Sequence, residues 1–319
     1  MRNKVLSGML GLAVGDALGV PVEFKSRAQL DAQPVRGMLG HGTHDQPAGT
    51  WSDDTTMALC TMEAITKDEG TAGAMQRFCR WVQEGYMTAH GQLFDIGMAT
   101  RKAIMLYMQV GLSPEECGGR AANENGNGSL MRILPLAYVL AQSRDKDGVM
   151  GLIHAHSCLT HAHPRSQMAC GIYCQVAARL ILGSAGREAV EAGLERARRY
   201  YGQKSEFAGE MATFADLTLA GLQSAAREDI QSSGYVVHTL KAALWCLLHT
   251  QSYGECVLAA VNLGEDTDTT AAVAGGLAGL LYGTGGIEQE WLDTLAARED
   301  IEELCRRFAM RLARSGEDE

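Results

Sequence analysis

Apolar residues recur along this chain at intervals of three and four, the spacing that places side chains on one face of an α-helix. The pattern is clear at Val5, Met9 and Leu12, and it returns over residues 244–248. The apolar segments are rich in Ala, Leu and Gly, whereas strands favour β-branched and aromatic residues. No Asn-Gly turn joins two alternating apolar runs, as a hairpin would require. We therefore expect an all-α protein.

No domain boundary is visible along the 319 residues. There are 6 Pro, no long polar linker and no repeat of fixed period, and the length suits one large domain. Residues 33–49 are the best candidate for a long loop. Gly275, Gly276 and Gly279 lie inside a helical pattern, where each costs about 1 kcal/mol relative to Ala, so close backbone packing or a nearby ligand is expected to compensate. We predict a single compact multi-helix domain over residues 1–319.

The composition argues against several kinds of partner. The formal net charge is −10 at pH 7 and no basic stripe occurs, so nucleic acid is not expected as the main partner. No apolar run approaches the roughly 20 residues that span a bilayer, so no membrane partner is expected. No exposed coiled-coil seam is visible, and we expect a monomer.

The first residues allow one alternative, a secretory signal peptide. Arg2 and Lys4 precede the apolar residues 5–14, and the small residues at 17–19 could pass for a cleavage site. Against this, Asp16 lies where cleavage would occur. The 9 Cys include no Cys-x-x-Cys pair, and their odd number suits reduced thiols. We therefore expect a cytoplasmic protein.

Two clusters of aspartate and hydroxyl residues each run into a helical stretch, one over residues 49–56 and the other over residues 262–270. One interpretation is helix capping, for which Ser52 and either Asp266 or Thr267 are suitable. However, two Asp and a hydroxyl within three or four residues exceed what one cap requires, and the arrangement occurs twice. The residues concerned are Ser52, Asp53, Asp54, Asp266, Asp268 and Thr269.

Carboxylate and hydroxyl oxygens are the ligands that Mg²⁺, Mn²⁺ and Ca²⁺ prefer. An EF-hand is excluded, because positions 6 and 12 counted from Asp53 are Ala58 and Ala64 instead of Gly and Glu. If the two helix starts meet in space, they could hold two divalent ions between them. Such a pair can clamp vicinal hydroxyls or phosphate oxygens at a reacting centre.

A glycine-rich loop lies in the middle of the chain, at Gly126, Asn127, Gly128 and Ser129. Its residue types favour positive φ angles, which would let successive N–H groups converge on an anion. The alternative is a tight loop between two helices.

Four histidines lie within ten residues, close to Cys158: His154, His156, His161 and His163. A zinc site is conceivable, but the spacings follow no zinc pattern, and the aspartate clusters already offer a site for a hard metal. His41 and His44 lie in the long loop and have no assigned role.

Five motifs of this chain resemble those of the ADP-ribosylglycohydrolase family and follow one another in the same order as in that family. The family includes dinitrogenase reductase-activating glycohydrolase and the ADP-ribosylarginine hydrolases. The resemblance extends over most of the chain, and five ordered motifs are a specific signal. The matching segments are residues 11–19 with 21–23, 51–55, 126–132, 160–161 and 264–269.

The resemblance implies an all-α fold with two Mg²⁺ or Mn²⁺ ions at the bottom of a central ADP-ribose cleft. The six residues of the two aspartate clusters would surround the metals, and the ions would bind hydroxyls of the ribose distal to the adenosine. Asp53 and Asp268 would act at the reacting ribose together with Glu23, whose alternative role is that of a surface glutamate. Asp95 would be a general acid or base at the leaving guanidine, or else a cap for the helix over residues 100–108.

The same resemblance assigns the ligand contacts. Gly126, Asn127, Gly128 and Ser129 would bind the diphosphate, and His161 would contact the ligand in the cleft. The other three histidines of that group would be polar surface or capping residues. Residues 36–49 match no family motif, which leaves the linkage specificity open.

We predict a metal-dependent hydrolase that removes ADP-ribose from a modified protein side chain, arginine in the first place, and releases ADP-ribose. The same scaffold could instead cleave a serine linkage, O-acetyl-ADP-ribose or ADP-ribosylated nucleic acid. A non-catalytic binding or immunity protein and an unrelated two-metal phosphohydrolase are further alternatives. The complete set of Asp53, Asp54, Asp266 and Asp268 argues against lost chemistry.

Overall fold

The structure, a computed structural model, describes residues 1–315 and contains no β-strand in that range. The prediction of a single, compact all-α domain is confirmed. The α-helices are α1 (Arg2–Gly19), α2 (Arg27–Ala32), α3 (Asp53–Thr66), α4 (Gly70–Glu84), α5 (Met98–Met105), α6 (Leu134–Gln142), α7 (Lys146–Cys158), α8 (Pro164–Ile181), α9 (Gly186–Tyr201), α10 (Leu219–Ser224), α11 (Val236–His249), α12 (Tyr253–Val261), α13 (Thr267–Tyr282), α14 (Gln289–Thr294) and α15 (Arg298–Ser315).

Shorter helical segments connect these elements. One is a π-helix, η3 (Leu106–Val110), and the others are 3₁₀-helices. The 3₁₀-helices are η1 (Val20–Val22), η2 (Gly42–His44), η4 (Pro114–Glu116), η5 (Ser205–Phe214), η6 (Arg227–Asp229) and η7 (Thr284–Gly286). The loop predicted over residues 33–49 contains one helical turn, η2, and an isolated β-bridge between His41 and Gln46.

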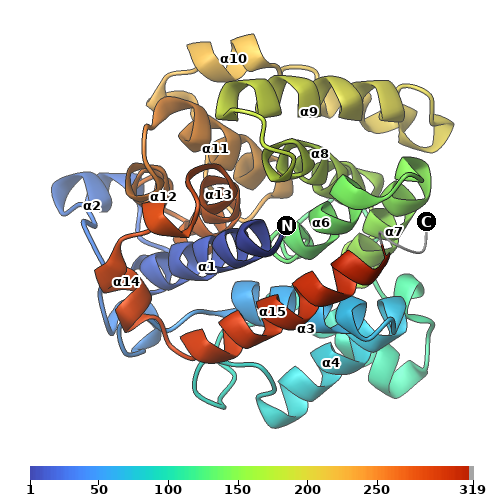
Figure 1. Cartoon of the computed structure of the whole chain (residues 1–319), viewed down its shortest axis with the longest axis horizontal. Helices are drawn as coiled ribbons and strands as arrows, with labels where there is room; N and C mark the ends of the chain where they lie inside the picture. The colour runs from blue at the N-terminus through green and yellow to red at the C-terminus, as the bar shows by residue number, and fades with distance from the viewer. Residues whose placement is uncertain (316–319) are drawn as a thin grey trace.

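The centre of the fold is the pair α1 and α13, which run side by side in opposite directions (Figure 1). Their backbones touch because glycines lie at the contact: a Cβ on Gly15 would lie 2.1 Å from the Ala271 carbonyl oxygen, and one on Gly279 would lie 2.1 Å from that of Ser7. A Cβ on Gly275 would meet the Gly11 carbonyl oxygen at 2.3 Å. The expected close packing around these helical glycines is therefore present.

This close approach determines where the two aspartate motifs lie. A Cβ on Gly19, the last residue of α1, would lie 2.3 Å from the Cα of Asp268 in the first turn of α13. The end of α1 and the start of α13 therefore occupy the same place. Helix α15 packs against both α1 and α3 and covers the other side of this centre (Figure 1).

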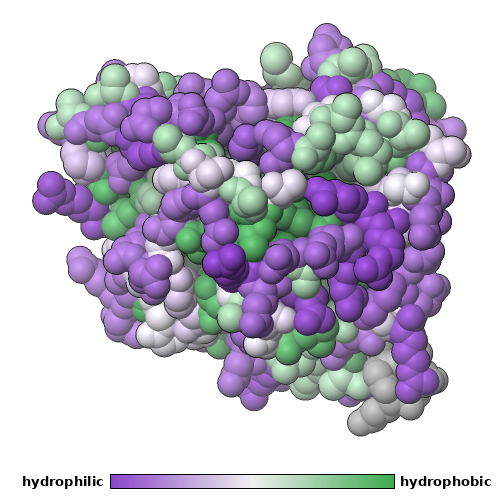
Figure 2. All heavy atoms as spheres, turned by 90° about the horizontal axis from the view of Figure 1, so that it is seen from above, coloured by the Kyte–Doolittle hydropathy of each residue, from purple (hydrophilic) through white to green (hydrophobic). Residues whose placement is uncertain are grey.

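The remaining helices enclose the pair, with α8 packed against α6, α7 and α9. Figure 2 looks onto the side of α9 and α10, where hydrophilic residues cover most of the surface and hydrophobic residues gather near its centre. All nine cysteines are free thiols, and eight of them are buried.

By length and composition, the segment Arg2–Val22 is apolar enough to cross a membrane, with a mean hydropathy of 1.7. The prediction that no apolar run approaches that length is therefore wrong. In the fold, 94% of this apolar stretch is buried inside the protein, where it forms the core helix α1. The same burial explains its composition, since a helix enclosed on all sides needs no polar face.

Candidate functional site

A cleft with a volume of about 630 Å³ opens at the ends of α1, α3 and α13. Its wall combines both aspartate motifs, the central glycine loop and the first turns of α5. The lining residues are Glu23, Phe24, Asp53, Asp95, Gly97, Met98, Ala99, Thr100, Lys102, Asn123, Glu124, Gly126, Asn127, Gly128, Met131, His161, Gly234, Asp266 and Thr269.

The two aspartate motifs meet at the bottom of this cleft, although more than 200 residues separate them in sequence. Carboxylate oxygens of Asp16, Asp54 and Asp268 lie within 4.8 Å of one another, and so do those of Glu23, Asp266 and Asp268. Asp268 belongs to both groups and joins them. The two helix starts therefore form one cluster of carboxylates, whose oxygens lie close enough together to share a metal ion.

Asp16 is a member of this cluster to which the sequence analysis assigned no role. Its carboxylate accepts hydrogen bonds from the amides of Ser52, at 2.9 Å, and Thr55, at 3.0 Å, and from the Thr55 hydroxyl at 2.6 Å. Burial raises the pKa of Asp16 to about 6, against the effect of these donors. Two signals in the sequence pointed to it: Asp16 is an acidic residue inside an otherwise apolar stretch, and it lies in the motif at residues 11–19.

The other buried aspartates have fewer donors. Burial, reinforced by the charges of neighbouring carboxylates, raises the pKa values of Asp53, Asp54 and Asp268 well above the usual range. Oδ1 of Asp54 and Oδ1 of Asp266 are buried without a hydrogen-bond partner in the described residues. Since a buried unpaired charge is costly, this set of hard oxygen donors fits a divalent cation of the Mg²⁺ or Mn²⁺ kind.

Hydroxyl groups flank the carboxylates at both helix starts. Ser52 caps α3, because its hydroxyl accepts a hydrogen bond from the Asp54 backbone N–H at 3.4 Å. The same hydroxyl also lies 3.3 Å from Asp54 Oδ2. At α13 the N-cap residue is Asp266, whose side chain makes no capping bond. The capping interpretation therefore holds for Ser52, while Asp266 Oδ2 accepts the Asn127 amide group at 2.8 Å. This hydrogen bond links the cluster of carboxylates to the glycine loop.

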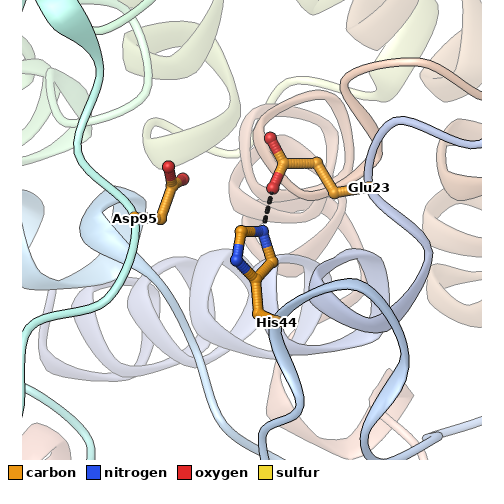
Figure 3. Close-up of side chains that lie close together, drawn as sticks. All are labelled: Glu23, His44 and Asp95. Carbon is orange, nitrogen blue, oxygen red and sulfur yellow. Dashed lines mark hydrogen bonds and ion pairs between the residues drawn. The ribbon is translucent and has the colours of Figure 1, made fainter.

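Glu23 is 6% exposed and lines the cleft, so it is not the surface glutamate of the alternative interpretation. Figure 3 shows Glu23, His44 and Asp95 converging from three separate segments, with a hydrogen bond between His44 Nε2 and Glu23 Oε2. The hydroxyl of Thr43 also donates to the Glu23 carbonyl at 2.8 Å. Burial raises the pKa of Glu23 to about 7, with the His44 bond acting in the opposite direction.

The role of His44, which the sequence left unassigned, is therefore to hold the Glu23 side chain. The 3₁₀-helix η2 brings it there, and the His44 ring packs between Phe24 and Phe94, with centroid distances of 6.1 and 5.4 Å. The hydrogen bond with Glu23 raises the pKa of His44.

Asp95 faces the cleft from the segment before α5. It has a positive φ of 49°. Helix α5 begins at Met98 with Gly97 as its N-cap, so Asp95 does not cap a helix and that alternative is wrong. Burial raises the pKa of Asp95, while the charge of His44 opposes the rise.

The glycine loop has a different conformation from the one expected. Neither Gly126 nor Gly128 has a positive φ. Glycine is needed at position 128 because there is no room for a side chain: a Cβ on Gly128 would lie 2.9 Å from Cε1 of His161. Gly126, Asn127 and Gly128 line the cleft, whereas the Ser129 hydroxyl is fully buried and accepts a hydrogen bond from Ser157 at 3.0 Å.

The four clustered histidines lie in three kinds of environment: the cleft wall, a helix cap and the buried interior. His161 lies in the cleft wall, where burial lowers its pKa to about 3 and the Thr160 hydroxyl contacts Nδ1 at 2.7 Å. His163 caps α8, as predicted. His154 and His156 are buried, so the prediction that they lie at the surface or in caps is wrong. None of the four belongs to a group of metal-type ligands within residues 1–315.

Comparisons with known proteins agree with this geometry. A model of the ADP-ribosylglycohydrolase family matches residues 1–318. The ADP-ribosylarginine hydrolase Tri1 of Serratia proteamaculans is 32% identical over 96% of this chain and 79% of its own length. The ADP-ribosyl-[dinitrogen reductase] glycohydrolase of Rhodospirillum rubrum is 31% identical over 100% of this chain and 98% of its own. A solved structure described as an ADP-ribosylglycohydrolase-related protein complex superposes with a TM-score of 0.80, at 31% identity, over 98% of both chains.

Proposed function

Because the chain belongs to the ADP-ribosylglycohydrolase family, we propose that it is a metal-dependent hydrolase that removes ADP-ribose from modified arginine side chains of proteins. The observation that carries the proposal is the carboxylate cluster at the bottom of the cleft, which includes buried oxygens without partners on Asp54 and Asp266. A cytoplasmic location accords with nine free thiols.

The metal would be held by Asp53, Asp54, Asp266 and Asp268, with the hydroxyls of Ser52 and Thr269 beside them. Asp54 and Asp266 lie in different groups of neighbouring carboxylates that share Asp268, which supports two ions, Mg²⁺ or Mn²⁺, one beside each of them. Bound there, such ions would orient the reacting ribose by binding its hydroxyl groups. Asp16 has a separate role, because its oxygens already accept three hydrogen bonds that fix the start of α3.

The chain's own residues would perform the remaining steps. The amides of the glycine loop would bind the diphosphate, and neutral His161 would contact the ligand beside them. Glu23 and Asp95 would flank the anomeric carbon, where carboxylates stabilise an oxocarbenium-like transition state. Their raised pKa values suit proton transfer near neutral pH, and Asp95 would move a proton at the attacking water or the leaving guanidine.

Two observations support arginine as the modified residue. The relatives reported above include an enzyme named as an ADP-ribosylarginine hydrolase. In addition, Glu23 and Asp95 place two carboxylates on the wall of the cleft, where they would attract a guanidinium group. A serine linkage or O-acetyl-ADP-ribose would present no such cation.

The test measures release of ADP-ribose from proteins modified on arginine and on serine, with Mg²⁺, with Mn²⁺ and with a chelator. We expect release from arginine only, lost with the chelator and in Asp268→Asn. Asp229→Asn changes an exposed aspartate and is the matched control. Release from serine with none from arginine would show that the enzyme cleaves the serine linkage instead of the arginine linkage. Metal binding without release from any substrate would indicate a binding protein.

A further inference from the structure

Two arginines are buried among residues 1–315, and they have different partners. Arg77 is paired with two carboxylates, Glu63 at 2.7 Å and Glu69 at 2.6 Å. Arg132 is 0% exposed and has no carboxylate oxygen within 4.0 Å in the described part of the chain. Its guanidinium carbon lies 5.2 Å from the centroid of the Phe78 ring. Arg132 is therefore a buried cation that the protein does not neutralise by direct pairing.

Arg132 is instead held by two main-chain carbonyls. Its Nη1 donates to the Gly128 carbonyl, its Nη2 donates to the His156 carbonyl at 2.9 Å, and its Nε is buried without a partner. Although burial lowers the pKa of Arg132 to about 10, the group stays protonated at neutral pH. Its charge reaches the cleft wall, because it adds to the effect of burial in lowering the pKa of His161. An unpaired buried charge is a cost to folding unless it serves another purpose.

The bond to Gly128 sets the direction of a peptide group in the cleft wall. No peptide bond in residues 1–315 is cis, so the Gly128 carbonyl and the Ser129 N–H point in opposite directions. Because the carbonyl points inward to Arg132, the Ser129 N–H points away from the buried guanidinium. That N–H donates to no other backbone group in the described residues. Gly128 lines the cleft, whereas Ser129 is 0% exposed and is not a lining residue, so Arg132 holds the Gly128–Ser129 peptide group from the buried side of the cleft wall.

We propose that Arg132 is a positioning residue for the diphosphate of the ligand: it holds the Gly128–Ser129 peptide group in the cleft wall, and its buried charge attracts the anion from behind the loop. This inference rests on the proposed function, which supplies a diphosphate-containing ligand. It also gives a reason for the missing carboxylate. An acid beside Arg132 would cancel the field at the place where the anion binds, since charges in a buried site are weakly screened.

The experiment compares Arg132→Met, which removes the charge and both hydrogen bonds, with Arg132→Lys, which keeps the charge but loses the paired geometry of the guanidinium. Dissociation constants for ADP-ribose and for adenosine, which lacks phosphate, are measured by calorimetry on the metal-loaded protein. We expect Arg132→Met to weaken ADP-ribose binding by about tenfold or more, Arg132→Lys to weaken it less, and neither to change adenosine binding. In turnover, KM should rise while kcat is largely kept, because the contact is made in both the ground state and the transition state.

Arg77→Lys is the matched control, because it makes the same change at the other buried arginine and should leave the dissociation constant of ADP-ribose unchanged. Hydrogen exchange of the segment that contains Ser129 gives a second readout: ADP-ribose should protect it in the wild type and protect it less in Arg132→Lys. Wild-type affinity for ADP-ribose in a folded Arg132→Met protein would overturn the inference. Equal losses for ADP-ribose and adenosine would also overturn it. No ADP-ribose binding by the wild type would instead contradict the proposed function.

Discussion

Helix α3 carries buried carboxylates at both of its ends, and the protein surrounds them differently. Near the C-terminal end, Glu63 is 4% exposed and contacts Arg77 at 2.7 Å, the Tyr86 hydroxyl at 2.7 Å and Lys67 at 3.1 Å. Burial alone would raise the pKa of Glu63, but the hydrogen bonds from these three side chains outweigh it and lower the pKa to about 2. This carboxylate is held as an anion by cations of the chain itself.

At the N-terminal end, Asp53 and Asp54 have no such partners. Their pKa values are raised well above the usual range, first by burial and then by the charges of other carboxylates. Burial is thus common to both ends of α3, and the difference lies in the missing cation. A fold that can neutralise Glu63 but leaves Asp53 and Asp54 without a cation has a place for a cation from solution.

The largest expected effect comes from Asp54→Asn, which removes one of the carboxylates without a cation from the N-terminal end of α3. We expect ADP-ribose release to fall by about a thousandfold or more, because a metal-type ligand is lost. The metal-free protein should become more stable, by about 1–3 kcal/mol, because one uncompensated buried charge is removed. Activity assays and thermal unfolding in chelator measure the two effects. A lower melting temperature without metal would show that Asp54 is already compensated.

Arg77→Met makes the opposite change at the other end of α3. Removing the arginine leaves Glu63 buried without its main partner, and we expect a loss of about 3–5 kcal/mol in unfolding free energy. Activity per folded molecule should stay unchanged, because Arg77 does not line the cleft. Adding Glu63→Gln should recover part of the loss, as urea unfolding would show. If the double variant is no more stable than Arg77→Met, the ion pair is not the cause.

Metal and pH should affect the two ends of α3 differently. At a metal concentration one hundred times its dissociation constant, we expect stabilisation of about 2.7 kcal/mol. Metal binds the ionised carboxylates, and the pKa values of the ligands Asp53, Asp54 and Asp268 are raised well above the usual range by burial and by neighbouring carboxylates. The metal-dependent rise in melting temperature should therefore be largest at alkaline pH and shrink as the pH falls, because protons compete with the metal for these carboxylates.

The Glu63 end provides the internal control for this titration. Because the pKa of Glu63 is lowered from its usual value near 4.5 to about 2, its contribution to stability is present above pH 4.5 and is lost only as the pH falls toward 2. The loss caused by Arg77→Met should therefore be constant between pH 5 and 8. Comparing melting temperatures with and without metal at each pH cancels the buried histidines, which destabilise the fold below pH 6.5 in both samples. A metal effect independent of pH would contradict the assignment.

Much of the fold could be predicted because its signals are local. Helical periodicity, the poor strand signals and the glycines inside α13 each depend on neighbours within a few residues. The composition of the two aspartate motifs left their meeting in space as a condition, and it was the family resemblance that implied that the two motifs face one another. The expectation that glycines in the central loop have positive φ was wrong, since the space left by His161 determines the need for glycine there.

The remaining site features depend on pairs that are distant in sequence. Asp16 reads as one acid in an apolar helix, and only the fold brings Ser52 and Thr55 to it. His44 lies in a loop that matches no motif, and its role depends on where Glu23 points. The sequence also does not predict that Arg132 lacks a carboxylate partner, because it has more acidic than basic residues. In each case the chemistry follows from three-dimensional placement, which residue type and spacing do not fix.

The smallest expected effect concerns Asp16. Its carboxylate is intermediate between Glu63, which is paired with cations, and Asp54, because amide and hydroxyl donors compensate its charge but no cation does. Thr55→Val removes the hydroxyl that donates to Asp16 at 2.6 Å while keeping the shape of the side chain. We expect a loss of about 1 kcal/mol at pH 8, where Asp16 is ionised. The loss should shrink below pH 6, because the protonated carboxyl needs the donor less. Thr61→Val is the control, since that buried hydroxyl of the same helix donates only to the Met57 carbonyl and its loss should not vary with pH. A pH-independent loss in Thr55→Val would mean that the hydroxyl packs α3 against α1 without compensating the charge of Asp16.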